Sequence, residues 1–391
     1  MGIARGPNIV KDNLVFGYDT GHGVADNETS TRFYPGEPTT NLYTNSDFNS
    51  ETGWTFGSWH NNAVTHTSVS NVIGRDGRTC KAEKLYIGAS SSASHFHQYN
   101  QGKYTSGNTY TTSAWVKGSG TFAIKSHWGG NTNFTMTGEW QRVSMTVTAT
   151  SSSSSHFPYF AGEGLTVGSY FYITDVQTEL KSHATPYVYS GGSTGSRSNT
   201  TGLIDLKRNT NINLSNVSFN STGQPTFDGT DDEINTGITT QLTDFSCVVV
   251  FKDNSSAAWG RLVDKSYTTG FFISSYFASV GAGYVGCGII EPSSPHGQAL
   301  QYDTSKYNYF VVTRSGSTHT IYLNGSTNKS QKTNGSSATL SSTEMTIGAW
   351  SGSTNTQRYT GEIPVVKLYN RQLTAEEIQQ DFNTYKNRFN I

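Results

Sequence analysis

Charged residues are scarce in this chain of 391 residues. They make up 14% of the sequence, and the formal net charge is -1. A protein that binds nucleic acid needs clustered Lys and Arg to neutralise phosphates, so this balance argues against a nucleic-acid partner. Disorder is also disfavoured, because disordered chains are rich in charge and poor in aromatic residues, and here aromatic residues reach 13%.

Cysteines and long apolar runs are scarce as well. Cys80, Cys247 and Cys287 are too few and too scattered for a disulfide framework or a cysteine-based zinc site, so we expect buried thiols. No apolar run approaches the ~18 residues of a membrane-spanning helix. Residues 1–7 lack the apolar segment of a signal peptide. These absences predict a chain that is made in the cytoplasm and is not inserted into a membrane.

The abundant residues are β-formers and turn formers. Together with 41 Gly and few charges, they indicate an all-β protein with many loops. Short alternating segments between residues 41 and 189 suggest a sandwich or jelly roll. In WQRVSMTVTA, the side predicted to face the core consists of Gln141, Val143, Met145, Val147 and Ala149. The sequence YFVVTRSGSTHTIYLNG predicts a hairpin that turns between Arg314 and Thr318.

One helix is predicted near the end, over residues 373–389. Thr374 followed by Glu377 forms a capping box, which marks where the helix begins. A stripe of apolar residues at helical spacing predicts that one face packs on a sheet: Ile378, Phe382, Tyr385 and Phe389. The expected fold class is therefore all-β, with two β-sandwich or jelly-roll domains and this helix packed on the second sandwich.

The C-terminal part contains the stretches FDGTDDEINTG, IYLNG, IGAW and GEIPVVKLYNRQLTAEEIQQDF. Through these stretches it resembles the concanavalin A-like (laminin G-like) domain common in tailed-phage structural proteins. In that family the domain opens with a strand much like NIVKDNLVFGYD, which here stands at residues 8–19. The resemblance thus implies that Val10 to Tyr18 pairs in the C-terminal sheet, with another module inserted after it.

The inserted module contains the stretches NLYTNSDFNSETGW, YTTSAWVKGSG, EWQRVSMTVTA and YFYITDVQTELKSHATPYVYS. Through these stretches it resembles the carbohydrate-binding-module jelly roll that recurs in phage tail and fibre proteins. A Gly/Ser/Thr stretch, YSGGSTGSRSNTT, follows it and reads as a linker. The predicted parts are an N-terminal arm and first strand of the second sandwich (1–36), the inserted jelly roll (37–190), the linker (191–201) and the sandwich with its helix (202–391).

Sugar binding requires exposed aromatic rings beside polar donors and acceptors, because the apolar C–H face of a sugar stacks on a ring. The carbohydrate-binding candidates by this criterion are Trp59, Trp128, His127, Trp259 and Trp350. Each has ordinary loop packing as its alternative. The remaining tryptophans that lie at positions typical of the family are expected in the core: Trp54, Trp115 and Trp140.

Two places in the sequence could hold a calcium ion. Asp175 in ITDVQTEL stands where related modules often hold a structural calcium ion, an implication of the resemblance. Asp228, Asp231 and Asp232 in DGTDDEI offer several oxygen ligands, although a tight turn before a strand explains Asp-Gly equally well.

No catalytic pair is evident in the sequence. Sandwich-fold glucanases usually carry E-x-D-x-x-E on one strand, and neither this motif nor G-x-S-x-G is found here. The resemblances imply a virion protein of a tailed phage, an appendage, fibre or decoration on the particle surface. Its expected partners are other virion proteins, host-surface glycan and copies of itself. A decoration protein that binds no sugar is the alternative, and a polysaccharide-degrading enzyme is a third.

Overall fold

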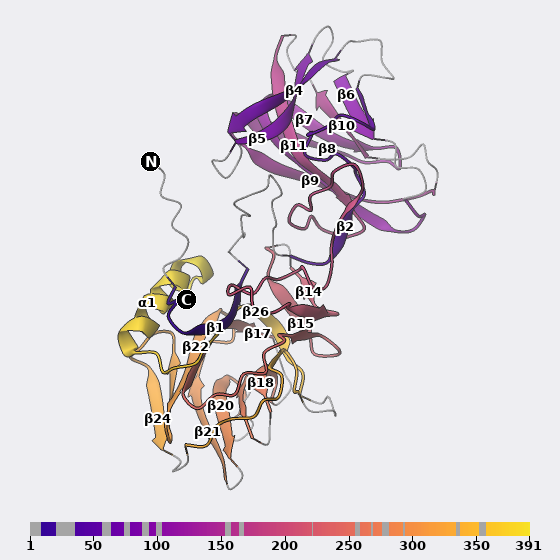
Figure 1. Ribbon diagram of the computed structural model, residues 1–391. Coiled ribbons are helices and arrows are strands. Elements are labelled where there is room, and N and C mark those ends of the chain that lie inside the picture. The colour runs from indigo at the N-terminus through magenta and orange to yellow at the C-terminus, as the bar shows by residue number, and fades with distance from the viewer. Residues whose placement is uncertain are drawn as a thin grey trace. The chain divides into compact units, whose positions relative to one another are not determined.

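The computed structural model confirms the predicted fold class: the chain is nearly all β with one helix near its C-terminus among the residues described (Figure 1). The described residues are 9–20, 36–56, 64–73, 79–87, 94–98, 104–152, 158–163, 168–220, 222–254, 259–266, 269–275, 281–291, 294–333, 337–351 and 357–391.

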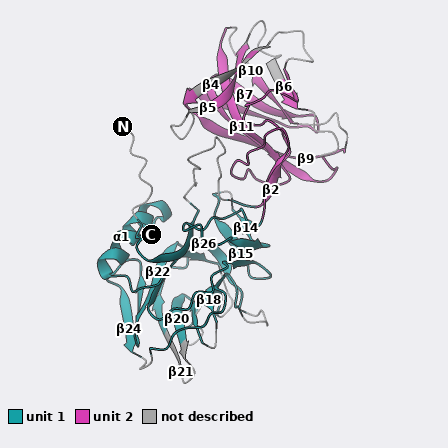
Figure 2. Ribbon diagram, viewed as in Figure 1, with its two compact units in different colours: residues 1–23, 35–37, 199–391 teal, residues 24–34, 38–198 magenta. Residues whose placement is uncertain are grey.

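The chain divides into two compact units (Figure 2). Of the described residues, 9–20, 36–37 and 199–391 form what we call the C-terminal unit, and 38–198 form the middle unit. The chain therefore leaves the C-terminal unit, builds the middle unit and returns.

The first strand belongs to the C-terminal unit. β1 (Leu14–Asp19) pairs antiparallel with β26 (Thr360–Tyr369), with Gly17 opposite Lys367. On its other side, the amide of Gly17 donates to Asp205 Oδ1 over 3.2 Å. The family resemblance implies this pairing for Val10 to Tyr18. It is confirmed from Leu14 to Tyr18, whereas residues 10–13 precede the strand.

The C-terminal unit contains an eight-stranded sheet in the order β14-β15-β26-β17-β22-β23-β24, with β1 added at β26. The strands not yet bounded are β14 (Ser218–Phe219), β15 (Pro225–Asp228), β17 (Phe245–Asp253), β22 (Asn308–Ser315), β23 (Thr318–Leu323) and β24 (Lys329–Thr333). β22 and β23 form the predicted hairpin, in which Ser315 lies opposite Thr318.

A second sheet of seven strands, in the order β13-β16-β25-β18-β19-β20-β21, completes this sandwich. Its strands are β13 (Asn213–Ser215), β16 (Glu233–Asn235), β25 (Thr346–Ile347), β18 (Arg261–Lys265), β19 (Phe271–Ser274), β20 (Tyr284–Glu291) and β21 (Ser294–Gln301). Both sheets contribute side chains to one buried apolar core.

Helix α1 (Ala375–Phe389) covers the other face of the eight-stranded sheet. This explains why residues 247–251 of β17 are apolar without interruption: Cys247 and Val249 face the sandwich core, whereas Val248 packs in the cluster that contains the helix. The predicted capping box is present, because Thr374 Oγ1 accepts from the amide of Glu377 and the Glu377 side chain accepts from the amide of Thr374. The four predicted stripe residues of the helix are all buried.

The middle unit has a nine-stranded sheet in the order β3-β6-β10-β7-β11-β5-β4, with β8 and β9 also paired to β7. The strands are β3 (Trp54–Phe56), β4 (Val64–Ile73), β5 (Thr79–Ile87), β6 (Ser94–Gln98), β7 (Thr109–Ser126), β8 (Asn131–Thr137), β9 (Gln141–Thr148), β10 (Pro158–Glu163) and β11 (Tyr170–Glu179). The first half of β7 pairs with β9 and β11, and the second half pairs with β8 and β10. The long strand β7 therefore pairs with strands of both layers of the middle unit's sandwich.

Residues 195–197, assigned to the linker from sequence, instead form β12 (Gly195–Arg197). This strand pairs with β2 (Thr39–Asn41). The Gly/Ser composition that suggested a linker is equally compatible with a short ribbon, since the backbone supplies its hydrogen bonds. The pair of β2 and β12 thus joins the segment where the chain enters the middle unit to the segment where the chain leaves it.

The tryptophan predictions are right for Trp54, which is 8% exposed in the core of the middle unit. They are wrong for Trp115 and Trp140, which are only half-buried and lie outside that core. The reason for Trp115 is strand alternation, because Ala114 and Val116 occupy the core face of β7 and turn Trp115 to the other face.

Two of the cysteines, Cys247 and Cys287, are buried free thiols, and Cys80 is half-buried. In the part of the chain that the structure describes, no helix combines the length and apolar character needed to cross a membrane.

Candidate functional site

Three tyrosines and a lysine gather on one face of neighbouring strands β5 and β11 in the middle unit. Tyr170 lies opposite Tyr86, and Tyr172 lies opposite Lys84. The ring centroids of Tyr86 and Tyr170 are 5.9 Å apart, and those of Tyr170 and Tyr172 are 5.6 Å apart. We call these four residues the tyrosine face.

The tyrosine face exists because both strands alternate. On β5, Glu83 and Leu85 point into the sandwich and are buried, so Lys84 and Tyr86 point outward. On β11, Phe171 and Ile173 fill the core in the same way and leave Tyr170 and Tyr172 outside. Tyr170 is 44% exposed, one of three large apolar residues with such exposure among those described.

The ammonium group of Lys84 lies against the tyrosine rings of this face. Lys84 Nζ lies 3.9 Å from the ring centroid of Tyr170 and 4.7 Å from that of Tyr86. A hydrogen bond with the Tyr86 side chain raises the pKa of Lys84 above its usual value. Lys117 on β7 lies opposite Tyr172 and adds a second cation to the same face. Tyr170 is exposed, whereas Tyr86 and Tyr172 are half-buried. An exposed ring can stack on a sugar, and neighbouring ammonium groups can donate to its hydroxyl or carboxylate oxygens.

Two of the three candidates in the middle unit, Trp128 and His127, lie just after the end of β7. Trp128 is only 8% exposed and packs edge-on against Tyr104, with ring centroids 4.9 Å apart. This burial leaves little of the indole available for stacking on a ligand. The neighbouring His127 is exposed, and its ring lies 5.3 Å from that of Tyr159, so these two form a smaller exposed rim.

The candidates of the C-terminal unit are half-buried. Trp259 packs edge-on against Phe272, with ring centroids 6.2 Å apart, and the Arg261 guanidinium lies 3.7 Å above the same Phe272 ring. Trp350 is half-buried after β25. Trp59 lies outside the described residues. Trp128 and His127 belong to the middle unit, and Trp259 and Trp350 belong to the C-terminal unit.

Among the described residues, two groups of three side chains could hold a metal ion, and Asp175 is in neither. Asp175 is buried on β11 with φ 51°, at a shift in the pairing with β7.

The three aspartates of the second predicted calcium site do lie close together. Ligand oxygens of Asp228, Asp231 and Asp232 lie within 4.8 Å of one another. Burial raises the pKa of Asp232 to about 6. Its Oδ2 accepts from the amide of Asp228 over 2.6 Å, as a tight turn requires.

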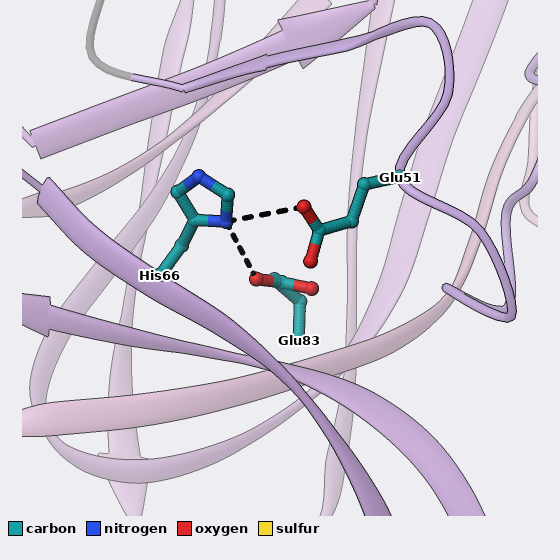
Figure 3. A group of neighbouring side chains, drawn as sticks. All are labelled: Glu51, His66 and Glu83. Atoms are coloured by element: carbon teal, nitrogen blue, oxygen red, sulfur yellow. Dashed lines mark hydrogen bonds and ion pairs between the residues drawn. The ribbon is translucent and has the colours of Figure 1, made fainter.

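The other group is Glu51, His66 and Glu83 (Figure 3). Sequence reasoning missed it, because these residues stand in three separate segments and share no motif. The tyrosine face was missed as well, because the predicted aromatic candidates were tryptophans and His127 and included no tyrosine. The signal was available there, since the alternation in SYFYITDVQTEL places Tyr170 and Tyr172 on one side of a strand whose other side is apolar.

Comparison with known proteins identifies part of the C-terminal unit. Residues 228–379 match the laminin G-type model described as the concanavalin A-like lectin/glucanases superfamily. The concanavalin A-like region so defined runs from the end of β15 into helix α1 and carries the motifs on which the resemblance rests. No curated protein matches the sequence.

Solved structures resemble the chain at low identity. One is botulinum neurotoxin type C, which depends on interaction with two ganglioside molecules to enter cells: 13% identity, TM-score 0.36, covering 48% of this chain and 50% of that chain. Another is domain 4 of the arabinanase AbnA from Geobacillus stearothermophilus in complex with arabinotriose: 12% identity, TM-score 0.38, covering 47% and 92%. A third is tailspike protein 4 of bacteriophage CBA120: 17% identity, TM-score 0.29, covering 36% and 21%. The chain thus spans half the length of the neurotoxin chain.

Proposed function

We propose that this protein binds carbohydrate through the tyrosine face and serves as a surface protein of a tailed-phage particle, where it adheres to host polysaccharide. The observation that carries the binding proposal is the row of Tyr86, Tyr170 and Tyr172 beside Lys84 on an open sheet face. The match of residues 228–379 to a superfamily of lectins and glucanases supports it.

Lys84 and Lys117 favour an acidic polysaccharide over a neutral one. An ammonium group gains more from a carboxylate than from a hydroxyl, because the carboxylate carries the opposite charge and adds Coulomb attraction to the hydrogen bond. Single sugar sites bind weakly, so adhesion requires many copies on one particle, each raising the effective affinity of the others.

Binding rather than catalysis is the proposed activity. Glu51 and Glu83 are the close carboxylate pair of the middle unit, but the side chain of Glu83 is fully buried. A glycan cannot reach an acid in that position, whereas a glycosidase needs both carboxyl groups at the scissile bond.

The phage assignment rests on the resemblance of both parts of the sequence to domains of tailed-phage structural proteins. A virion role predicts that antibody against the chain labels intact particles in electron micrographs. Label confined to lysate protein, with clean particles, would remove the virion role without affecting sugar binding.

The binding site is tested by replacing Tyr170 and Tyr172 with Ala and measuring binding to acidic and neutral polysaccharides. An aromatic contact adds roughly 0.5–1.5 kcal/mol beyond area burial, so each replacement should weaken binding about threefold to tenfold. His127→Ala is the matched control, since it removes an exposed ring from the same unit elsewhere. If His127→Ala lowers binding and the tyrosine variants do not, the site lies at the His127–Tyr159 rim instead. No binding by the assembled wild-type protein would favour a decoration protein without a sugar ligand.

A further inference from the structure

Two carboxylates and an imidazole converge on the side of β5 opposite to Lys84. Glu83 lies on β5, His66 lies on the adjacent strand β4, and Glu51 lies just before β3. His66 Nδ1 is 3.1 Å from Glu83 Oε1 and 3.5 Å from Glu51 Oε2. Figure 3 shows both carboxylates turned toward the same ring nitrogen.

Glu83 is the unusual member of this cluster. Its side chain is 0% exposed, and Oε2 makes no hydrogen bond with any residue that the structure describes. A buried carboxylate with an unsatisfied oxygen is costly unless a proton or a cation compensates it.

We propose that Glu51, His66 and Glu83 form a binding site for a divalent transition-metal ion, with Zn²⁺ as the preferred ion. A tetrahedral Zn²⁺ ion with bonds of about 2.0–2.1 Å separates its ligand atoms by about 3.3 Å. The distances of 3.1 Å and 3.5 Å match that separation. The three ligand atoms all lie within 4.8 Å of one another.

The ligand set selects the class of ion. Imidazole nitrogen suits Zn²⁺ and its neighbours in the transition series, whereas Ca²⁺ takes six to eight oxygen ligands. The His66 ring is also held in orientation, because it stacks on Phe56 with centroids 3.8 Å apart and planes 11° apart.

The exposure of two of the three proposed ligands permits exchange of an ion with solvent. The side chains of His66 and Glu51 are 31% and 36% exposed, so an ion can reach the buried Glu83 from outside. Once bound, the ion would tie the segment before β3 to the hairpin of β4 and β5. The proposed metal site uses none of the residues of the tyrosine face. Its test is therefore independent of the test of sugar binding.

The test is isothermal titration of the untagged, metal-depleted full chain with ZnCl₂. One tight Zn²⁺ equivalent per chain is expected, together with a rise in the thermal midpoint. Loss of an outer-shell partner alone costs about 10–100-fold in affinity, so losing a ligand in Glu51→Gln or His66→Asn should cost more than about 100-fold. Both replaced side chains are partly exposed, so these variants avoid the folding risk of Glu83→Gln. The matched controls are Glu139→Gln, an exposed acid of the same unit, and His127→Asn, an exposed histidine.

X-ray absorption of the zinc-loaded wild type supplies a second measurement. One imidazole nitrogen and carboxylate oxygens around the ion are expected. Absence of a tight equivalent, equal affinity in the Glu51 and His66 variants, or sulfur from a cysteine in the absorption spectrum would each overturn the proposal. The first outcome would mean that Glu83 keeps a proton and shares it with Glu51 instead of holding a metal.

Discussion

A buried ion pair joins helix α1 to the sheet beneath it, and its removal gives the sharpest test of how this fold is held. Lys367 on β26 forms an ion pair with Asp381 on α1, and both side chains are 0% exposed. Tyr309 on β22 donates a hydrogen bond to the other Asp381 oxygen, Oδ2, over 3.0 Å. Burial lowers the pKa of Lys367, and the charge of Asp381 opposes that shift.

Replacing Lys367 with Met leaves Asp381 charged, buried and without its cation. Breaking a buried pair in this way costs about 3–5 kcal/mol, a large fraction of the roughly 5–15 kcal/mol that stabilises a typical domain. Replacing both partners, in Lys367→Met with Asp381→Leu, removes both desolvation costs. The double variant should therefore be more stable than Lys367→Met alone, because apolar substitutes for buried pairs are often neutral or stabilising.

The assay is urea unfolding followed by circular dichroism at the helical minimum, which reports on α1 and hence on the C-terminal unit. The two single variants, the double variant and the wild type form a cycle, and we expect a coupling free energy of about 2 kcal/mol or more between the two sites. Simple addition of the two single losses in the double variant would refute the reasoning. It would mean that the two charges are independently solvated in the folded protein.

Two further predictions concern the seven-stranded sheet of the C-terminal unit. A Cβ atom at Gly288 would lie 2.2 Å from Phe272 Cε1, so Gly288→Ala should destabilise the unit by about 1–3 kcal/mol through overpacking; an unchanged urea midpoint would contradict it. Lys265 is fully buried, and burial lowers its pKa from 10.5 to about 8. The folded protein then binds fewer protons than the unfolded chain between pH 8 and 10.5, so the stability of the wild type relative to Lys265→Met should rise with pH in that window, by up to about 3 kcal/mol. A relative stability that falls with pH there would show that the ammonium is favourably solvated.

Local patterns in the sequence were sufficient to predict features that lie within a single helix, strand or turn. The capping box at Thr374 and Glu377 and the Ser315–Thr318 hairpin turn depend on residues a few positions apart. The all-β class follows from composition and alternation, which report the periodic contact of each strand with a core. The pairing of β1 with β26 was reached differently, through resemblance to a family, because no local signal links residues so far apart.

Only the tertiary structure decided which faces are exposed and which side chains meet. Alternation shows that Tyr170 and Tyr172 share a side of β11, but the neighbouring strand β5 brings Tyr86 and Lys84 beside them. Trp128 looks exposed in a Gly- and Asn-rich loop, yet it is buried because Tyr104 packs on it from another segment. Glu51, His66 and Glu83 come from three strands or loops, and their convergence depends on pairing across the sheet. The sequence determines periodicity, which is local, whereas burial and convergence are set by contacts between distant segments.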